Sequence, residues 1–445
     1  MEIPECYKHR HAYHFTSMEN LESIIDSGLL STSLKNSRGI SHVNVAEASI
    51  QDRRSTMLIP GTDGRCVHDY VPFYFAQKTP MQLAVLNKKN VDQEFLIYLS
   101  ISISVLNTRP GVFFTDASAN TDIAPNFYPA TEAHQLNNLK WQVIDNHKWS
   151  YHDDDERHQK MAELLIPDQV SIAEISEIIT WDPSISGYVR QIFQEKGVVP
   201  PHITDNSYHY YADPDNWAYS LVTGPNLLKK NFEDTVNNIN ISQTNNAKFQ
   251  NLESALLAVQ GDFCAIKELS DIDGLAANYG PHNDDVGTHS RRVAELVRLS
   301  PEYAKLSDHN KAILEIAAYL HDIGKGPKSR WKNSYMDKAD NNHARKSLPM
   351  LQRILTEDIG AIPNDSVRKL VMLVTYDDLL GDIAANGRDK IQLFNIVTCR
   401  EEIEMLVALS KADIGSLSQT WLNNVTSEID NLRAEVIVAL ESSTE

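Results

Sequence analysis

Four side chains in the C-terminal half have the types and the spacing of ligands for a divalent metal. His289 lies in GTHSRRVAELV, His321 and Asp322 are adjacent in AAYLHDIGKG, and Asp413 lies in LSKADIGS. Each is in or beside a segment whose apolar residues recur every three or four positions, as in an amphipathic helix. Imidazole nitrogens together with carboxylate oxygens suit a divalent transition metal. The spacing therefore predicts a metal site built from several helices.

One carboxylate indicates a second site, in the N-terminal half. Glu163 begins the apolar run ELLIP, and an ionised carboxylate in a strand-built cleft costs free energy unless it has a partner or a task. His14 and Thr16 lie where the strand-like HAYHF meets a helix, a junction at which side chains and backbone N–H groups can face a ligand. A salt bridge at a strand edge would equally explain Glu163. Arg54 and Tyr74 also fit a solvated helix end and a core aromatic, so these residues alone leave the choice open.

The elements that must position this carboxylate are short strands with a few helices between them. The run EFLIYLSISIS alternates apolar and polar residues, which predicts a strand with one buried and one exposed face. Other runs of strand length are VPFYF, GVFFTD, MAELLIP and EISEIITW. Thr16 and Glu19 are expected to cap a helix that has its apolar stripe at Leu21, Ile24 and Ile25 and ends at Gly28. The N-terminal half is therefore predicted to be α+β.

The C-terminal half changes to a helical period after a stretch rich in Asn, Gln and Ser at residues 237–251. That stretch predicts a linker. A chain of 445 residues also exceeds the size at which one hydrophobic core keeps growing. We expect two domains: an α+β domain over residues 1–230, a linker over 231–260, and an all-helical domain over 261–445.

The charge balance limits how this chain can hold a nucleic acid. Its net charge is −19, and both halves are acidic. Tight binding to duplex phosphates needs many Lys and Arg contacts, so a nucleic-acid substrate would have to be held locally, by a groove and stacked bases. No apolar run approaches the roughly 20 residues that cross a bilayer, and no secretory signal is visible. The expected location is the cytoplasm, without a membrane partner.

Several separated segments of the N-terminal half resemble, in the same order, the DarT family of NAD-dependent DNA ADP-ribosyltransferases. They are HFTSMENLESIIDSGLL, IQDRR, HDYVPFYFAQKTPMQLAVL, FFTDASAN, the segment around Trp141, and RHQKMAELLIP. VPFYF followed by a Pro-Met turn is the most distinctive of them. The resemblance implies an ADP-ribosyltransferase-like fold, NAD as a substrate, and transfer of ADP-ribose to a base in single-stranded nucleic acid, with DNA the leading expectation.

The resemblance also implies roles for individual residues. Glu163 would be the catalytic carboxylate, which stabilises the oxocarbenium-like ribose left when nicotinamide departs. Arg54, or its neighbour Arg53, would bind the NAD phosphates or assist deprotonation of the base. The residues expected to bind NAD are His14, Thr16, Asn20, Tyr74 and Met81. Where family members have an Arg near the cofactor phosphates, this chain has Lys78, which keeps the charge but loses bidentate geometry.

The ligand set of the C-terminal half resembles the HD superfamily of metal-dependent phosphohydrolases, of which HDIGKG is a specific form. His343 is similar to an additional ligand of the two-metal members. The next expected His is absent, because that helix end has the sequence LVTYDDLLGD. Asp377 or Asp378 would have to replace it, and a single metal is the simpler expectation. Lys325 is placed to contact a substrate phosphate.

Three functions follow from these observations. The first is an ADP-ribosyltransferase acting on nucleic acid with a fused HD phosphohydrolase or regulatory domain, in toxin–antitoxin or phage-defence biology. Family analogy adds a macrodomain antitoxin as a partner. The alternative is an HD nucleotide phosphohydrolase whose N-terminal half only binds a nucleotide or nucleic acid. The third is a sensor without turnover, in which the HD residues form only a surface or a degenerate site.

Overall fold

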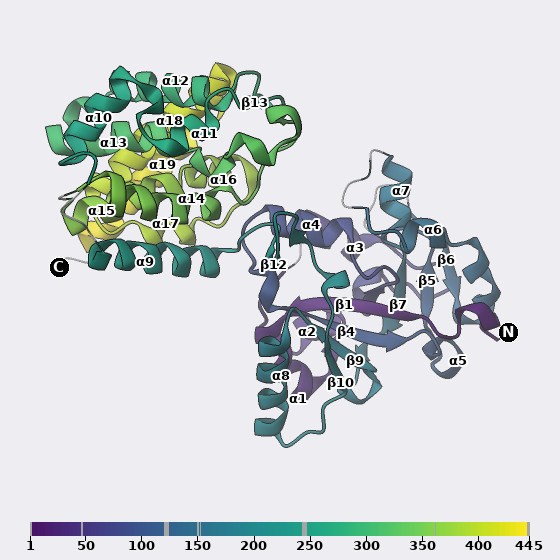
Figure 1. The fold of residues 1–445 in the computed structure, drawn as a ribbon. Coiled ribbons are helices and arrows are strands. Elements are labelled where there is room, and N and C mark those ends of the chain that lie inside the picture. Colours follow the sequence, from purple (N-terminus) through teal and green to yellow (C-terminus); the bar gives the residue numbers. More distant parts are fainter. Residues whose placement is uncertain are drawn as a thin grey trace. The chain divides into compact units, whose positions relative to one another are not determined.

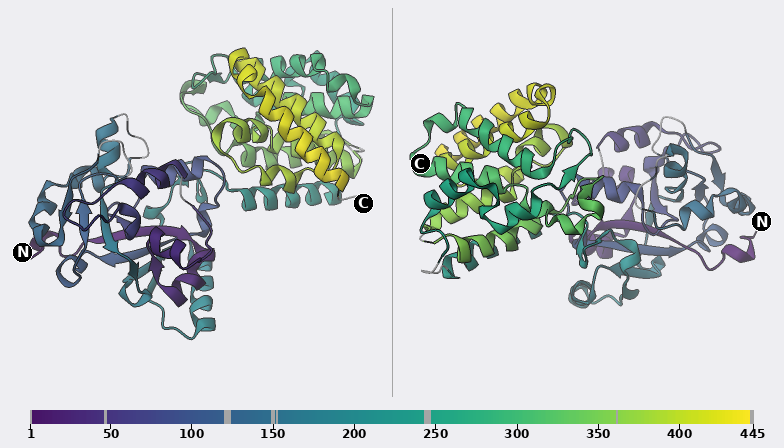
Figure 2. Two further views of the ribbon diagram at one scale, coloured as in Figure 1. Left: turned by 180° about the vertical axis from the view of Figure 1, so that it is seen from behind. Right: turned by 45° about the horizontal axis from the view of Figure 1, so that its top comes forward.

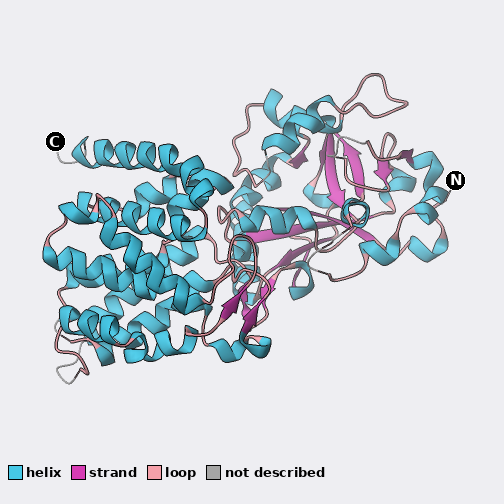
Figure 3. Ribbon diagram, turned by 90° about the horizontal axis from the view of Figure 1, so that it is seen from above, coloured by secondary structure: helices cyan, strands magenta, loops and turns pink. Residues whose placement is uncertain are grey.

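A computed structural model describes residues 2–45, 48–119, 124–148, 151, 153–242, 247–360 and 362–442. The chain divides into two compact units. The first comprises Met1–Asn87 and Val91–Leu221, and the second comprises Lys88–Asn90 and Val222–Glu445. Figure 1 labels the elements of each unit, and Figure 3 shows that the long strands belong to the first unit while the second is almost entirely helical. The prediction of an α+β domain followed by a helical domain is confirmed.

An eight-stranded sheet is the frame of the first unit, with the order β10-β9-β4-β1-β3-β7-β5-β6. All neighbours are antiparallel except β9 and β10. The strands are β1 (His11–Ser17), β3 (Tyr70–Tyr74), β4 (Leu96–Ser102), β5 (Phe113–Thr115), β6 (Phe127–Pro129), β7 (Glu163–Pro167), β9 (Glu177–Thr180) and β10 (His202–Asp205). Two smaller pairs are β2 (Leu29–Leu30) with β8 (Gln169–Val170) and β11 (Ala212–Asp213) with β12 (Asn216–Ser220).

The helices of the first unit are short, apart from the last. They are α1 (Leu21–Ser27), α2 (Thr32–Ser37), α3 (Ala48–Thr56), α4 (Pro80–Asn87), α5 (Val105–Thr108), α6 (Trp141–Ile144), α7 (Asp154–Gln159) and α8 (Pro183–Lys196). Helix α8 has well-defined ends, because the Asp182 side chain accepts the backbone N–H groups of Ser184 and Ile185 and Gly197 closes it in the left-handed conformation.

The sheet separates between β1 and β3. Strand β1 pairs with β4 along its whole length, but with β3 it has only the register Tyr13↔Tyr74. Strand β3 in turn pairs fully with β7, which places Tyr74 opposite Glu163. Backbone groups that are not used in a ladder, and the side chains beside them, are available to a ligand. This separation lies directly beside the first residue of β7.

Strand β4 is buried on both faces, so the prediction of one exposed face is wrong. Tyr98 and Ser100, on the face predicted to be polar, are 2% and 1% exposed. A segment 111 residues further along the chain covers them: the Tyr98 hydroxyl donates to the His209 carbonyl at 2.6 Å, and the Tyr210 ring packs edge-on against Tyr98 at 5.3 Å. Alternation within one strand does not reveal a cover supplied from so far away in sequence.

Helix α1 has the predicted buried stripe and the predicted end at Gly28, but a different start. The Ser17 side chain accepts the backbone N–H of Glu19 at 3.3 Å, and a 3₁₀ turn over Met18–Asn20 precedes the helix. The Thr16 hydroxyl accepts instead from the Asn20 side chain at 3.0 Å. Thr16 is therefore part of a side-chain contact at the end of β1 and does not cap the helix.

One apolar core holds the helices of the second unit together. They are α9 (Pro225–Ser242), α10 (Leu252–Gly261), α11 (Lys267–Ile272), α12 (Val286–Leu299), α13 (Asp308–Leu320), α14 (His343–Arg353), α15 (Asn364–Thr375), α16 (Leu379–Asn386), α17 (Ile391–Ile396), α18 (Arg400–Leu417) and α19 (Gln419–Ser442). A two-residue strand, β13 (Ala276–Ala277), pairs with β14 (Tyr335–Met336). Helix α19, yellow in Figure 2, buries a single stripe at Val425, Ile429, Leu432 and Val436.

The stretch 231–260, predicted as a linker, is largely helical. Helix α9 runs to Ser242 and buries Phe232 and Ile239, and α10 begins at Leu252. The apolar residues of α9 recur at helical spacing, but its many asparagines obscured that period. Residues 243–246 of the predicted linker lie outside the described residues. Among the described residues, no helix combines the length and the apolar character that crossing a membrane requires.

Candidate nucleotide cavity and metal centre

A cavity of about 200 Å³ lies beside β1 and β3 in the first unit. All the residues expected to bind NAD line it, and so does the expected phosphate ligand; they are His14, Thr16, Asn20, Tyr74, Met81 and Arg54. The neighbouring Arg53 is exposed and does not line it. The described lining residues include two cations, Lys35 and Arg54, and no carboxylate. The cavity therefore favours an anionic ligand.

Glu163 is held by a buried bidentate ion pair. Arg54 Nη1 and Nη2 donate to its Oε1 and Oε2, each at 2.9 Å, and the backbone N–H of Ala119 donates to Oε1 at 3.2 Å. Glu163 is 0% exposed and Arg54 is 6% exposed. Burial alone would lower the pKa of Arg54, but Glu163 raises it above its usual value. Because Arg54 lines the cavity and Glu163 does not, the guanidinium lies between the carboxylate and the ligand space.

Three strands fix the position of this carboxylate. Glu163 is the first residue of β7, and its backbone N–H donates to the Thr115 hydroxyl of β5 at 3.0 Å. Tyr74, the last residue of β3, is its cross-strand neighbour. Burial and Glu163 raise the pKa of Tyr74 well above 10, so its phenol stays protonated. Its ring stacks with Phe15 of β1 at 6.4 Å, which joins the two sides of the opening.

His14 is a neutral imidazole with a defined tautomer. Its Nδ1 lies 2.8 Å from the Pro72 carbonyl, which can only accept, so Nδ1 carries the proton. Burial lowers the pKa of His14 to about 4, and Arg54 contributes to this shift. Nε2 is therefore unprotonated at neutral pH. It can accept a hydrogen bond from a hydroxyl group of a ligand in the cavity.

Asn20 positions the cavity wall. Its Nδ2 donates to the Thr16 hydroxyl at 3.0 Å and to the Val43 carbonyl at 2.9 Å, and its Oδ1 accepts the Val43 N–H at 2.8 Å. Both amide N–H groups are thus used within the protein. The Thr16 hydroxyl, which accepts from Asn20, still has its own proton to donate. The geometry favours Thr16 over Asn20 as the direct ligand contact.

Some lining residues had no signal in the sequence. Lys35 of α2 lies 2.7 Å from His42, and Gln51 of α3 lies 3.1 Å from His68. They are isolated polar residues on short helices and loops, and only the fold brings them to one cavity. Lys78, in contrast, does not line this cavity, so the expectation that it lies near the cofactor phosphates differs from the structure.

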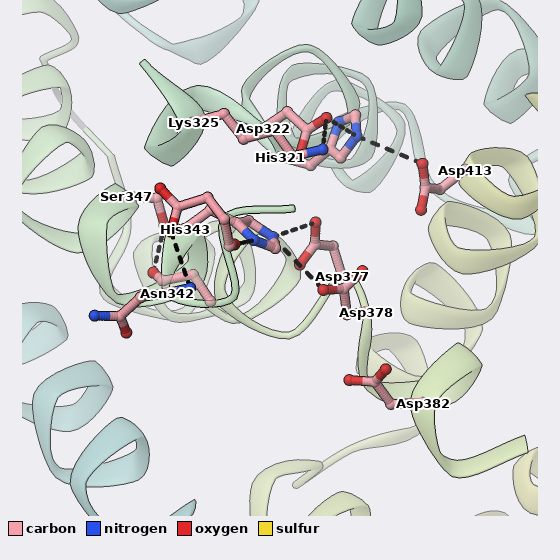
Figure 4. A network of polar contacts seen from close by, with 12 residues as sticks. His321, Asp322, Lys325, Asn342, His343, Ser347, Asp377, Asp378, Asp382 and Asp413 are labelled. Atoms are coloured by element: carbon pink, nitrogen blue, oxygen red, sulfur yellow. Dashed lines mark hydrogen bonds and ion pairs between the residues drawn. The ribbon is translucent and has the colours of Figure 1, made fainter. Parts of the chain in front are cut away.

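The second unit brings the predicted metal ligands together (Figure 4). His289 Nε2 lies 2.9 Å from Asp413 Oδ1, 3.6 Å from Asp322 Oδ2 and 3.2 Å from His321 Nε2. His321 Nε2 lies 3.5 Å from Asp322 and 3.6 Å from Asp413. Ligands at about 2.0–2.2 Å from one divalent ion have such separations from each other. Helix α12, the end of α13 and helix α18 supply these groups.

Hydrogen bonds turn both imidazoles toward this centre. His321 Nδ1 donates to the Ala318 carbonyl at 2.8 Å. His289 Nδ1 lies 3.0 Å from the Ser416 hydroxyl, which itself donates to the Asp413 carbonyl. In each ring this leaves Nε2 directed at the other ligands, the arrangement that orients metal-binding histidines. The four-residue donor set therefore fits a divalent transition metal.

The electrostatics of the centre also favour a cation. Burial lowers the pKa of His321, but Asp322 and Asp413 together raise it to about 10. Burial likewise lowers the pKa of His343, which Asp377 and Asp378 raise to about 9. When no metal is present, these carboxylates stabilise the protonated form of the two imidazoles. A divalent ion displaces such protons when it binds.

His343 lies in a neighbouring group of carboxylates. Its Nε2 is 3.7 Å from Asp377 and 3.6 Å from Asp378, and its Nδ1 donates to the Asp340 carbonyl at 2.8 Å. Ligand atoms of Asp322, His343 and Asp377 all lie within 4.8 Å of one another. His343 Nε2 and Asp377 Oδ1 are buried without a hydrogen-bond partner. Asp322 thus belongs to both ligand groups.

Two further features of the centre follow from HDIGKG. Lys325 is 6% exposed, and its Nζ donates to Asp322 Oδ2 at 2.8 Å. A Cβ atom at Gly324 would lie 1.9 Å from the His343 carbonyl, so only glycine lets these two segments approach. His282, which had no sequence signal, lies with its ring 5.6 Å from His289 at the side of the centre.

Residues 13–212 match the family model for ssDNA thymidine ADP-ribosyltransferase, DarT, and residues 286–380 match the HD domain. A DNA ADP-ribosyl transferase of Thermus aquaticus is 32% identical over 189 residues, covering 41% of this chain and 80% of that protein. One from Thermus sp. 2.9 is 30% identical over 188 residues, covering 41% and 87%. The solved structure of Thermus sp. 2.9 DarT in complex with ADP-ribosylated ssDNA has 27% identity and a TM-score of 0.42, over 47% of this chain and 99% of that chain.

The first unit is thus a DNA ADP-ribosyltransferase domain with a mixed α/β sheet, and the second contains an HD domain. The chain belongs to the DarT family.

Removing Arg54 while Glu163 remains is predicted to destabilise the first unit. Arg54→Met leaves a buried carboxylate without its cation, at a cost of about 3–5 kcal/mol. Adding Glu163→Gln removes the uncompensated charge, so the double variant regains most of that stability. Urea unfolding followed by tryptophan fluorescence measures the three free energies. Arg157→Met, which removes an exposed pair with Asp154, is the control and costs about 1 kcal/mol or less. Equal stability of Arg54→Met and wild type would contradict the prediction.

Proposed function

We propose that the first unit transfers ADP-ribose from NAD to a base in single-stranded DNA. The observation that carries this proposal is the buried Arg54–Glu163 pair at the wall of a cavity that also presents His14, Thr16 and Tyr74. The matching family model is described as acting on thymidine in ssDNA. Relatives at 30–32% identity are named DNA ADP-ribosyl transferases. A thymine base is therefore the first acceptor to test.

The reaction exchanges one bond at C1′ of the nicotinamide ribose. The bond from C1′ to the nicotinamide nitrogen breaks, and nicotinamide leaves with the electron pair. The Glu163 carboxylate stabilises the oxocarbenium-like ribose that remains. A ring nitrogen of the base then supplies the pair for the new bond to C1′, and its proton passes to Glu163 or to water. His14 Nε2 accepts a hydrogen bond from a ribose hydroxyl and so fixes the sugar.

Arg54 acts in this scheme as a fixed cation. Because Glu163 raises its pKa, it keeps its proton and does not act as the base that deprotonates the acceptor. Guanidinium groups bind phosphate oxygens in the same bidentate manner as carboxylates. A bound diphosphate would compete for Arg54 and turn a Glu163 oxygen toward the ribose. The resting pair thereby keeps the carboxylate neutralised until the substrate arrives.

Transfer is tested by incubating the full chain with NAD and thymine-containing single-stranded oligonucleotides, followed by intact mass measurement. We expect each modified strand to gain the mass of one ADP-ribose unit. Glu163→Gln removes the charge that stabilises the transition state, so the rate falls at least about 100-fold, as for other preorganised electrostatic contacts.

Glu195→Gln is the matched control, because Glu195 is exposed on α8 and the chemical change is the same. We expect it to have the wild-type rate, and NAD binding by calorimetry to remain measurable in Glu163→Gln. Full transfer activity of Glu163→Gln would refute the assigned role of this carboxylate. Absence of modification by the wild type, on DNA and on RNA, would refute the proposed function.

We also propose that the second unit is a metal-dependent phosphohydrolase, because four ligands from three helices converge at ligand-shell distances. A divalent ion held there would polarise a phosphoryl oxygen and lower the pKa of bound water. Lys325, which lies in the centre, adds a positive charge beside a substrate phosphate.

ADP-ribose contains a phosphoanhydride, so the product of the first unit belongs to the class of substrates that a phosphohydrolase cleaves. A Thermosipho africanus relative, 24% identical over 201 residues and 50% of that protein, is named as a transferase–glycohydrolase fusion. Hydrolysis of the phosphoanhydride would leave ribose phosphate on the base, so we expect the second unit to trim the modification. A macrodomain antitoxin stays a prediction.

Hydrolysis is tested on a purified ADP-ribosylated oligonucleotide, with Glu163→Gln protein so that no transfer interferes. We expect loss of mass from the strand with Mn²⁺ present, and no loss after addition of a chelator. Asp322→Asn removes a ligand common to both groups, so it should also abolish the loss. Trimming that continues in Asp322→Asn would assign the activity to another site. An intact strand under all metal conditions would refute this substrate.

We infer in addition that the His343 group holds a second ion, with Asp377 in the place of the missing histidine and Asp322 shared. Metal analysis after saturation and gel filtration should give about two ions per chain for wild type and about one for Asp377→Asn. Asp337→Asn, an exposed change in the same unit, is the control and should match wild type. One ion in wild type, unchanged by Asp377→Asn, would support the simpler single-metal centre.

A further inference from the structure

A second cavity of the first unit, of about 320 Å³, has no part in the mechanism above. It lies where β1 begins, where the chain leaves β3 and where it approaches β7. The residues that matter among its lining are Arg10, Tyr13, Lys78, Asp145 and Lys160. The NAD-type cavity has its own cations, Lys35 and Arg54, and the two cavities have no lining residue in common in the described parts of the chain.

The charge of this second cavity is unusual for a chain of net charge −19. Its described lining contains the cations Arg10, Lys78 and Lys160 but a single carboxylate, Asp145. Arg10 and Asp145 neutralise each other through a bidentate pair at 2.8 Å and 2.8 Å. The Arg10 guanidinium also lies 3.8 Å from the centre of the Trp141 ring. Two lysines therefore remain without a carboxylate partner at the cavity wall.

Lys78 is the clearest case of an uncompensated charge. It is 9% exposed, and within the described residues it makes no ion pair and no hydrogen bond. Its Nζ lies 5.3 Å from the Tyr211 ring, and burial lowers its pKa. The Lys78 side chain is thus largely buried and its ammonium has no anion among the described residues, which costs free energy that an apolar residue of similar length would not. A ligand that supplies the anion removes this cost.

Lys160 shapes the same wall. Its Nζ donates to the carbonyls of Ile144 and Asn146 at 2.6 Å and 2.5 Å, which uses two of its three N–H groups. Burial lowers the pKa of Lys160 to about 8, against the effect of Asp145 and together with that of Lys78. The two ammonium groups are thus close enough to repel each other. An anion between them would relieve that repulsion.

The lining of the second cavity is connected to the strands that hold the catalytic carboxylate. Phe75, which lines it, donates its backbone N–H to the Ala162 carbonyl at 3.1 Å. Ala162 directly precedes Glu163, the first residue of β7, and Phe75 directly follows Tyr74, the cross-strand neighbour of Glu163, so a lining residue of this cavity is the chain neighbour of Tyr74. When a base of a single-stranded DNA substrate reaches Glu163, the phosphates on either side of that nucleotide come with it. These phosphates need a cationic site close by but outside the NAD cavity.

We propose that this second cavity binds a backbone phosphate of the acceptor strand beside the modified nucleotide, with Lys78 as its ion partner. The proposal rests on the proposed transferase function and identifies how an acidic chain holds its polyanionic substrate. The chemistry required is that of a phosphodiester. The diphosphate of NAD has similar chemistry, and the experiment separates the two sources.

The test compares wild type with Lys78→Met and Lys78→Arg in the full chain. Binding of a fluorescent thymine-containing oligonucleotide is measured by anisotropy at several salt concentrations. Loss of one phosphate contact reduces the slope of log K against log salt by about 0.7 for single strands. We expect this reduction in Lys78→Met, with a KM for oligonucleotide about tenfold higher, corresponding to about 1.4 kcal/mol. The KM for NAD should not change, and Lys78→Arg should retain binding.

Lys196→Met is the matched control, because it removes the same charge from a surface pair on α8. Its salt slope and both KM values should equal those of wild type. Since Lys78 has no ion pair or hydrogen bond to lose among the described residues, and only a contact with the Tyr211 ring, thermal unfolding of Lys78→Met should occur close to the wild-type temperature. An unchanged salt slope in Lys78→Met, or a higher KM for NAD alone, would overturn this site while transfer by wild type stands. A wild-type chain that neither binds nor modifies any oligonucleotide would overturn the proposed function, and this site with it.

Discussion

A charge that is buried away from water must be neutralised, and this constraint organises both units. Each buried ion loses hydration worth several kcal/mol, which only a partner with good geometry returns. In the first unit the partner of Glu163 is Arg54, 109 residues earlier in the chain. The pair ties α3 to the first residue of β7. The same contact that stabilises the fold therefore places a carboxylate and a guanidinium at the wall of the ligand cavity.

The second unit meets the constraint in another way. Asp322, Asp377, Asp378 and Asp413 face a centre in which Lys325 is the one permanent cation among the residues that Figure 4 labels. Asp378 is also paired with Lys89 at 3.3 Å, and the neighbouring carboxylates favour protonated imidazoles because they raise the pKa of His321 and of His343. A proton carries one positive charge and cannot be coordinated by several ligands at once. A divalent ion carries two charges and can be bound by several carboxylates and imidazoles together. Asp322 and Asp377 are each only 2% exposed, and the burial of these two carboxylates beside each other is an argument for a metal.

The sequence predicted the part of each site that depends on local order. The adjacent His321 and Asp322 at a helix end, with His289 before and Asp413 after, predicted a group of side chains that the structure brings together. Pairings that depend on distant segments were not visible: nothing in IQDRR indicates that Arg54, and not Arg53, meets Glu163. The sequence indicated Asp377 and Asp378 as alternatives but did not choose between them, because two acidic residues at a helix end are common on surfaces.

The errors in the fold have the same origin. Strand β4 has the alternation of a half-exposed strand, and only the tertiary cover from residues 209–211 buries its polar face. Helix α9 has a helical period, but its asparagines favour a linker by composition. Lys78 was placed beside the cofactor by resemblance, whereas the path of the backbone after β3 takes its side chain to the other cavity. Local patterns define elements, and long-range packing decides which face or cavity each side chain enters.

The two solutions to buried charge have different consequences for control. A guanidinium has a pKa far above neutral pH, so Arg54 stays charged whenever the first unit is folded, and it pairs with Glu163 while no substrate occupies the cavity. The carboxylates of the second unit would be neutralised by the proposed metal ions, and binding of those ions would be coupled to deprotonation of His321 and His343. Under this proposal, metal supply would change the charge state, and with it the stability, of the second unit. It leaves the ion pair of the first unit unchanged, because no group of that pair is a metal ligand in the described structure.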